Sequence, residues 1–241
     1  MSGREMFRTG AKWTASVLGL AFGAYTGYVA TTWIGYGRPP RTKREDTDLL
    51  LDRVLPDYEV GEHHQIHVAA PTEITFNTAC EMDLMRSPII RAIFRTRELV
   101  LGADHHPVNS AAGLLRFSQS VGWNVLAEIP GREIVMGAVT QPWKANVVFR
   151  SLSPDEFIAF DEPGYVKIVW TIRADPDGES QSLFRHDTRV ATTDAVARAK
   201  FRTYWAFLSP GIKLIRLLLL KPLRAEAELR AQFAATPVGS V

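Results

Sequence analysis

A periodic apolar stripe near the C-terminus constrains the fold of this chain more than any other feature. Between Thr193 and Gln232, apolar residues recur every three or four positions, at Ala197, Phe201, Trp205, Leu208, Ile212, Ile215, Leu219 and Leu223. This spacing is typical of one face of an α-helix, kept here for about seven turns. Ser209-Pro210-Gly211 interrupts the stripe without shifting its phase. We therefore predict one long, kinked helix that covers a broad apolar surface, with Ser209 as a cap at the kink.

The segments before this helix predict the surface that it covers. Two helices are expected at 71–81 and 88–101, the second capped by Ser87 and opened by Pro88. Strands are expected at 62–69, 122–129, 132–141, 147–152, 156–160, 165–174 and 182–192. Their short connections favour antiparallel pairing. The sequence thus predicts an α+β fold in which a curved antiparallel sheet is wrapped around the long C-terminal helix, with a cavity between the two.

An uncharged segment near the N-terminus predicts a transmembrane helix. The 24 residues of 13–36 contain no charged side chain, and Lys12 and Arg38 flank them. A helix of this length spans about 36 Å, which is enough to cross a bilayer. Trp13 lies at one end and Trp33 at the other, where aromatic rings favour the interface. We expect a single-pass protein of the cell membrane whose large domain is cytoplasmic, since slightly more basic residues follow the helix than precede it.

Two alternatives for this segment stay open at the sequence level: a cleaved signal peptide and a soluble core helix. Small residues also recur in it every four positions, including Gly19, Gly23 and Gly27. Such a stripe lets two helices approach closely in a membrane. The sequence therefore predicts helix packing at these glycines, either in a homodimer or with a partner transmembrane helix.

The distribution of charge argues against a nucleic-acid binder. Residues 1–44 carry seven Lys and Arg against one acid, and residues 198–230 carry eight against two. Residues 45–197 carry 13 against 23, so basic ends enclose an acidic middle. A nucleic-acid-binding domain usually concentrates basic residues on one face. We expect the basic segments to lie near anionic lipid instead, so that the bilayer is a predicted partner.

Several short motifs, taken in order, resemble the SRPBCC superfamily, which includes START domains and polyketide-cyclase-like proteins. They are Val68-Ala69-Ala70-Pro71, Arg86-Ser87-Pro88, Gly122-Trp123, Phe160-Asp161-Glu162-Pro163-Gly164-Tyr165, Asp187-Thr188-Arg189-Val190 and Phe201-Arg202-Thr203-Tyr204-Trp205. The resemblance covers about 49–230 and is strongest to a bacterial branch to which no reaction is assigned. It implies a helix-grip fold with a cavity for a hydrophobic or amphipathic small molecule. Lys221-Pro222, inside the last helix, departs from the pattern.

The chain is accordingly divided into five segments. They are a basic tail at 1–12, the transmembrane helix at 13–36, a polar linker at 37–48, the SRPBCC/START-like domain at 49–230 and a flexible tail at 231–241.

Candidate ligand-binding residues come from the predicted last strands and helix. Asp187 and Arg189 share a strand face and could form a polar pair that orients a ligand in the cavity. Large aromatic residues could form its wall, namely Trp123, Trp170, Tyr204 and Trp205. The histidines at 63, 64, 67, 105 and 106 lack a spacing that fixes three converging ligands, so no metal is expected. No catalytic residue and no cofactor are predicted, because no nucleophile motif or phosphate loop occurs.

Three functions are compatible with this pattern. The first is a membrane-anchored START-like domain that binds a lipid, polyketide or quinone. The second is a cyclase or dehydratase that uses polar groups such as Asp187 and Arg189. The third is a non-catalytic subunit of a membrane assembly, docked through the glycine stripe. We favour the first, because the resemblance implies a cavity and the spacing of chemical groups assigns no reaction.

Overall fold

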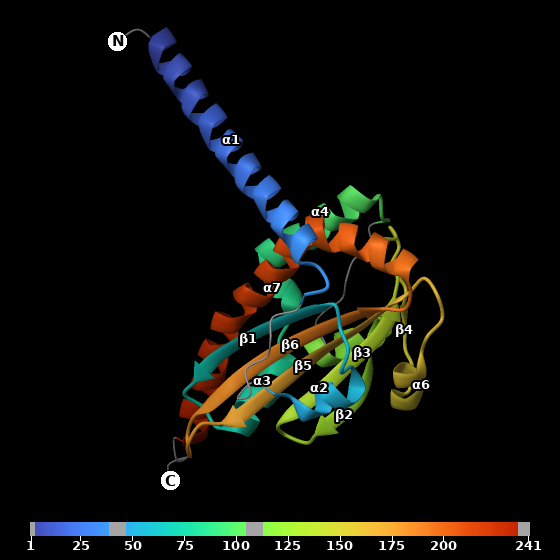
Figure 1. Cartoon of the computed structure of the whole chain (residues 1–241). Helices are drawn as coiled ribbons and strands as arrows, with labels where there is room; N and C mark the ends of the chain where they lie inside the picture. The colour runs from blue at the N-terminus through green and yellow to red at the C-terminus, as the bar shows by residue number, and fades with distance from the viewer. Residues whose placement is uncertain (1–2, 39–46, 105–112, 236–241) are drawn as a thin grey trace.

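The fold is a six-stranded antiparallel sheet with a long C-terminal helix across one face. A computed structural model describes residues 3–38, 47–104 and 113–235, with side chains from residue 19 onward. The strands are β1 (Val60–Val68), β2 (Asn124–Ile129), β3 (Glu133–Thr140), β4 (Phe149–Arg150), β5 (Val166–Pro176) and β6 (Ser182–Thr192). They are ordered β1-β6-β5-β3-β2. The short strand β4 pairs with the last two residues of β3, Val139 and Thr140. Figure 1 shows the curved sheet with the C-terminal helix along it, the arrangement of a helix-grip fold.

The predicted C-terminal helix is present and is the longest element of the domain. It is α7 (Ala195–Ala235), 41 residues long, and contains both Pro210 and Pro222. Its first turn is held by Asp194, whose Oδ1 accepts a hydrogen bond from the Ala197 amide at 2.5 Å. Figure 1 shows α7 changing direction along its length, as expected where a proline removes a backbone donor. Ser209 does not start a new helix, however; its hydroxyl bonds to Tyr28 Oη at 3.0 Å.

The sheet has two differently covered faces, which we call the cavity face and the outer face. On the cavity face, α7 and α3 (Thr72–Glu81) pack over a core that includes Trp170, Ile172 and Phe184. On the outer face, α2 (Leu49–Val54) and α6 (Pro154–Ala159) pack over Leu126, Val135, Val139 and Val169. Because side chains alternate along a strand, each residue of β5 and β6 belongs to one face only.

Most of the predicted elements are found, and the exceptions have local causes. The expected helix at 88–101 is α4 (Pro88–Leu101), and Ser87 Oγ accepts from the Ile90 amide as predicted. The expected strand at 156–160 is wrong, because α6 occupies this segment. Ser153 and Glu156 form a capping box that starts this helix at Pro154. The expected strand at 147–152 shortens to β4. A short helix, α5 (Leu114–Ser120), and a 3₁₀ turn, η2 (Leu84–Arg86), were not expected.

The prediction of a transmembrane helix is wrong. The segment does form a helix, α1 (Gly3–Gly35), and Figure 1 shows it projecting from the body of the protein. Among the helices of the described residues, however, none is both long and apolar enough to cross a bilayer. Its glycine, threonine and tyrosine residues dilute the apolar ones, and the absence of charge does not compensate for them. The predicted single-pass location in the cell membrane depended on this helix and is corrected with it.

The C-terminal part of α1 packs against α7 through aromatic and polar side chains. Tyr25 Oη donates to the Phe207 carbonyl at 2.9 Å; just after α1, Tyr36 Oη donates to Glu59 Oε2, before β1, at 2.8 Å. The guanidinium of Arg202 donates to the Trp33 carbonyl and lies 4.5 Å from the centre of the Trp33 ring. These contacts fix the direction of α1 relative to the domain.

The glycine stripe lies away from these contacts. A Cβ atom added at Gly19, Gly23 or Gly27 would meet no other described atom within 4 Å. These glycines therefore pack against nothing in the described part of this chain. The prediction that they contact a second helix stays a prediction.

A buried pair of carboxyl groups lies on the outer face, where the chain enters α2. Asp48 and Glu133 are 2% and 3% exposed, and Arg173 lies 3.9 Å from Asp48 Oδ2 and 3.8 Å from Glu133 Oε2. Asp48 Oδ1 also accepts from the Leu51 amide at 2.9 Å and thereby caps α2. Burial, then the neighbouring Asp48, raise the pKa of Glu133 to about 8. Near neutral pH the Glu133 carboxyl group thus keeps its proton.

This pair makes the stability of the fold fall as pH rises. The pKa of Glu133 is raised from 4.5 to about 8 on folding, so the folded state holds a proton that the unfolded state releases. Its contribution is complete below pH 4.5 and is lost as pH approaches 8. We expect Glu133→Gln, which keeps a neutral donor, to flatten this fall in urea unfolding at pH 5, 6.5 and 8. Glu128→Gln, at an exposed site on β2, should keep the wild-type slope; equal slopes for both variants would contradict the prediction.

Candidate functional site

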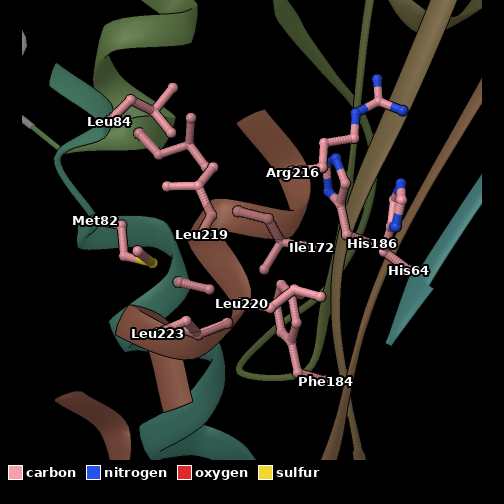
Figure 2. Close-up of a pocket in the computed structure, with 12 residues that line it drawn as sticks. His64, Met82, Leu84, Ile172, Phe184, His186, Arg216, Leu219, Leu220 and Leu223 are labelled. Atoms are coloured by element: carbon pink, nitrogen blue, oxygen red, sulfur yellow. The ribbon is translucent and has the colours of Figure 1, made fainter. Parts of the chain in front are cut away.

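A cavity lies between α7 and the cavity face of the sheet, as the fold prediction required. Its volume is about 50 Å³, and its walls are almost entirely apolar. Figure 2 shows leucines of α7 facing Ile172 and Phe184 across it, with Met82 beside them. The complete lining is His64, Ala79, Met82, Leu84, Leu114, Ile172, Phe184, His186, Arg216, Leu219, Leu220 and Leu223.

Three nitrogen-bearing side chains are gathered at one end of this cavity. They are His64 from β1, His186 from β6 and Arg216 from α7 (Figure 2). His64 and His186 are direct partners in the register of β1 and β6, so their rings project from the same face. Arg216 reaches them from the opposite wall. The cavity therefore has one polar end and one apolar end, a division typical of sites for amphipathic molecules.

The protonation of His186 follows from its hydrogen bond. Its Nδ1 lies 2.6 Å from the Thr171 carbonyl oxygen. A carbonyl only accepts, so Nδ1 carries the proton and Nε2 keeps a free lone pair. Burial, then the neighbouring Arg216 charge, lower the pKa of this ring to about 3. Burial and the same charge also lower the pKa of His64. Both rings are thus held in the neutral form.

Arg216 is a charged group without a described partner. Its Nη1 atom is buried and makes no hydrogen bond with any residue in the part of the chain that the structure describes. Burial lowers its pKa to about 10, so the guanidinium stays protonated at neutral pH. Buried guanidinium groups are normally paired, because an unpaired charge in an apolar setting is costly. A cationic donor is therefore available to a molecule in the cavity.

The predicted polar pair of Asp187 and Arg189 lies on the outer face, away from the cavity. Asp187 Oδ1 is 2.7 Å from His63 Nδ1. Arg189 donates to the Leu55 carbonyl at 3.0 Å and to Asp52 Oδ1 at 2.6 Å, and its guanidinium stacks on Tyr58. The two side chains do share one strand face, as expected, but it is the outer face, where Arg189 contacts α2. Neither one lines the cavity.

The four predicted aromatic residues are divided between two places. Trp170 is on the cavity face, and its ring centre lies 5.9 Å from that of His186. Trp123 packs against Trp170 at the same distance. Tyr204 and Trp205 pack with Phe201 in a separate cluster near the start of α7. Trp170 thus packs against His186 at the polar end of the cavity. Tyr204 and Trp205 lie outside the cavity.

The sequence contains a signal for the cavity residues that were not predicted. Along β6, Phe184, His186, Thr188 and Val190 alternate with Arg185, Asp187, Arg189 and Ala191. The first set is the less charged one and marks the cavity face. On α7, Arg216 lies four residues after Ile212 and three before Leu219, within the apolar stripe. A lone charge on an apolar helix face is the pattern that would have identified it.

The remaining histidines have other positions. His67 Nδ1 lies 3.0 Å from Asp177 Oδ2 at an exposed site, and His63 pairs with Asp187. His105 and His106 lie outside the described residues.

Comparisons with known proteins do not assign the chain to a family. No protein-family model matches it, and no curated protein is similar enough to count as a relative. Two similar solved structures are the Zhui aromatase/cyclase of a Streptomyces species and norcoclaurine synthase of Thalictrum flavum. Both are 14% identical; the first covers 75% of this chain and 98% of its own with a TM-score of 0.27, the second 66% and 86% with 0.24.

A conserved protein of Geobacillus kaustophilus is similar at 10% identity, with 64% of this chain and 95% of its own covered and a TM-score of 0.23. TM-scores this low carry no argument about family or reaction. The helix-grip arrangement therefore rests on the strand order and α7 of this chain itself, and membership of the SRPBCC superfamily stays a prediction.

Proposed function

We propose that this protein binds a small hydrophobic or amphipathic molecule in the cavity beneath α7. The observation that carries the proposal is the cavity itself, with apolar walls from α7, α3 and the sheet and a polar end at Arg216. Binding sites of this kind combine a mostly apolar lining with a few polar groups that orient the ligand. The cavity lies beneath α7, so a bound molecule would be partly shielded from water.

The cavity as it stands is smaller than such a ligand. A volume of about 50 Å³ holds roughly three or four water molecules. Arg216, Leu219 and Leu220 lie on the part of α7 between Pro210 and Pro222. Neither proline can donate to the carbonyl four residues earlier, so this part of α7 is tied less firmly to its neighbours than an ordinary helix. Its displacement from the sheet is the movement that we propose enlarges the cavity.

The cyclase or dehydratase alternative has less support. Its two named side chains, Asp187 and Arg189, lie on the outer face, where Asp187 pairs with His63 and Arg189 with Asp52 of α2. The ring of His186 does face the cavity, but its pKa of about 3 makes it a weak base at neutral pH. Binding needs none of these groups to exchange a proton, and it is the function that the geometry favours.

Filling the cavity provides the test of binding. Ala79 is 2% exposed and lines the cavity, so Ala79→Met is expected to occupy the space with a flexible side chain. We expect cyclohexylmethanol to bind the wild-type protein, detected by amide shifts of cavity residues in NMR spectra, and to bind this variant at least tenfold more weakly. The thermal stability of the variant should be unchanged or higher.

The matched control is Ala92→Met, at an exposed position of α4. It adds the same side chain outside the cavity and should bind the alcohol as the wild type does. Mass spectrometry of the protein purified under native conditions would show a co-purifying molecule. Equal binding by wild type and Ala79→Met would show that the alcohol binds elsewhere and would contradict the proposal.

A further inference from the structure

We infer that the ligand carries a carboxylate, and that Arg216 with His64 forms the subsite for this head group. The inference rests on the proposed binding function and specifies the chemical class of the ligand. It depends on which groups the protein leaves without partners at the polar end of the cavity.

The carboxylates nearest to Arg216 are already engaged by other groups. Glu62 Oε1 accepts from Lys213 Nζ at 2.9 Å, and Asp187 Oδ1 is paired with His63 on the outer face. Among the described residues, no carboxylate forms an ion pair with Arg216. The positive charge at this end of the cavity therefore lacks a contacting counter-charge from the described part of the chain, and an anionic ligand would supply one.

A second donor is available beside the guanidinium. Nε2 of His64 is buried and makes no hydrogen bond with any described residue, although Glu62 Oε2 lies 4.0 Å from it. A neutral imidazole can place its single proton on either nitrogen, so Nε2 can donate to a ligand oxygen. The ring lies next to His186 in the strand register, at the same end as Arg216. A group with two oxygen atoms could thus accept one bond from each side chain.

The number of charges favours a carboxylate over a phosphate. Arg216 contributes one positive charge, and the two neighbouring rings are neutral. A phosphate monoester brings nearly two negative charges and three acceptor oxygens at neutral pH, which exceeds what these groups neutralise. A carboxylate brings one charge on a planar group that matches the guanidinium. The apolar body of the ligand would then lie among Leu219, Leu220 and Phe184.

The test compares two probes that share an apolar ring and differ only in the head group. They are cyclohexanecarboxylate and cyclohexylmethanol, titrated into the full-length protein at pH 7 and followed by NMR shifts and calorimetry. We expect the wild type to bind the carboxylate at least tenfold more tightly than the alcohol. Arg216→Met should bring the ratio of the two affinities close to one. Arg216→Lys, which keeps the charge without the planar fork, should give a ratio between those of the wild type and Arg216→Met.

Arg224→Met is the matched control, since Arg224 is exposed on the same helix and pairs with Glu228 on the surface. It should keep the wild-type preference. If neither probe binds any variant, the proposed function fails together with the inference. If both probes bind equally well to the wild type, or if Arg216→Met keeps the preference, the inference alone is overturned. If Arg216→Met fails to fold, the test is the affinity of Arg216→Lys for cyclohexanecarboxylate. An affinity equal to that of the wild type would refute the inference.

Discussion

Replacing Arg189 with methionine is expected to lower the free energy of unfolding by about 3 kcal/mol. Arg189 is 7% exposed and joins β6 to α2 on the outer face. Its loss would leave the Leu55 carbonyl without this donor, at a cost of about 2 kcal/mol. The loss of stacking on Tyr58 adds roughly 1 kcal/mol. The ion pair with Asp52 adds little, because the Asp52 side chain is 43% exposed.

Urea unfolding measures this effect, and Arg53→Met is its control. Arg53 lies on α2 but is exposed, so its replacement should change stability by less than about 0.5 kcal/mol. Binding of cyclohexylmethanol should be unaffected in folded Arg189→Met. A variant with normal stability but impaired binding would instead place Arg189 in the ligand site, as its position in the sequence first indicated.

Replacing Arg216 with methionine is expected to have the opposite effect and to raise the free energy of unfolding by about 2 kcal/mol. This guanidinium has a buried Nη1 without a hydrogen bond, so its burial costs free energy that the nearby charges of Glu62 and Asp187 offset only in part. Methionine keeps much of the length of the side chain and adapts to irregular space. A gain in stability on removal of a polar group is the signature of a residue kept for binding rather than for folding.

Arg224→Met separates this effect from a general loss of positive charge. Arg224 forms a surface pair with Glu228, so its removal should lower stability by less than about 1 kcal/mol. Thermal and urea unfolding of both variants, without ligand, provide the comparison. If Arg216→Met is less stable than the wild type, Arg216 forms a stabilising interaction in the ligand-free protein. The guanidinium would then not be free to bind an anionic ligand.

The backbone of the domain could largely be predicted from local patterns. The stripe of α7 and the alternation in β5 and β6 are long, regular signals that tertiary packing reinforces. The helix α6 was missed because Phe157, Ile158 and Phe160 also suit a strand. The capping box of Ser153 and Glu156 favours the helix, because its hydrogen bonds satisfy backbone donors at the helix start.

The polar end of the cavity was harder to predict, because it depends on which face of the strand points inward. A shift by one residue exchanges His186 for Asp187. Acidic and basic neighbours such as Asp187 and Arg189 suggest a functional pair in the sequence, yet the alternation of the strand places both on the outer face. The pairing of His64 with His186 depends on the register between β1 and β6, which are far apart in the sequence. Only the assembled sheet brings these side chains together.

The burial of His186 beside Arg216 keeps the charges of these two groups constant over a wide pH range. The His186 ring stays neutral above about pH 3, and the Arg216 guanidinium stays charged below about pH 10. Between these limits His186 and Arg216 keep constant charges, and of the groups in the proposed subsite only His64, whose pKa is lowered by burial and by Arg216, can gain a proton in acid. The pH dependence of carboxylate binding would then follow the titration of the ligand rather than that of these two groups. Affinity should fall only where acid neutralises the ligand itself, so the protein would bind in mildly acidic and mildly alkaline surroundings alike.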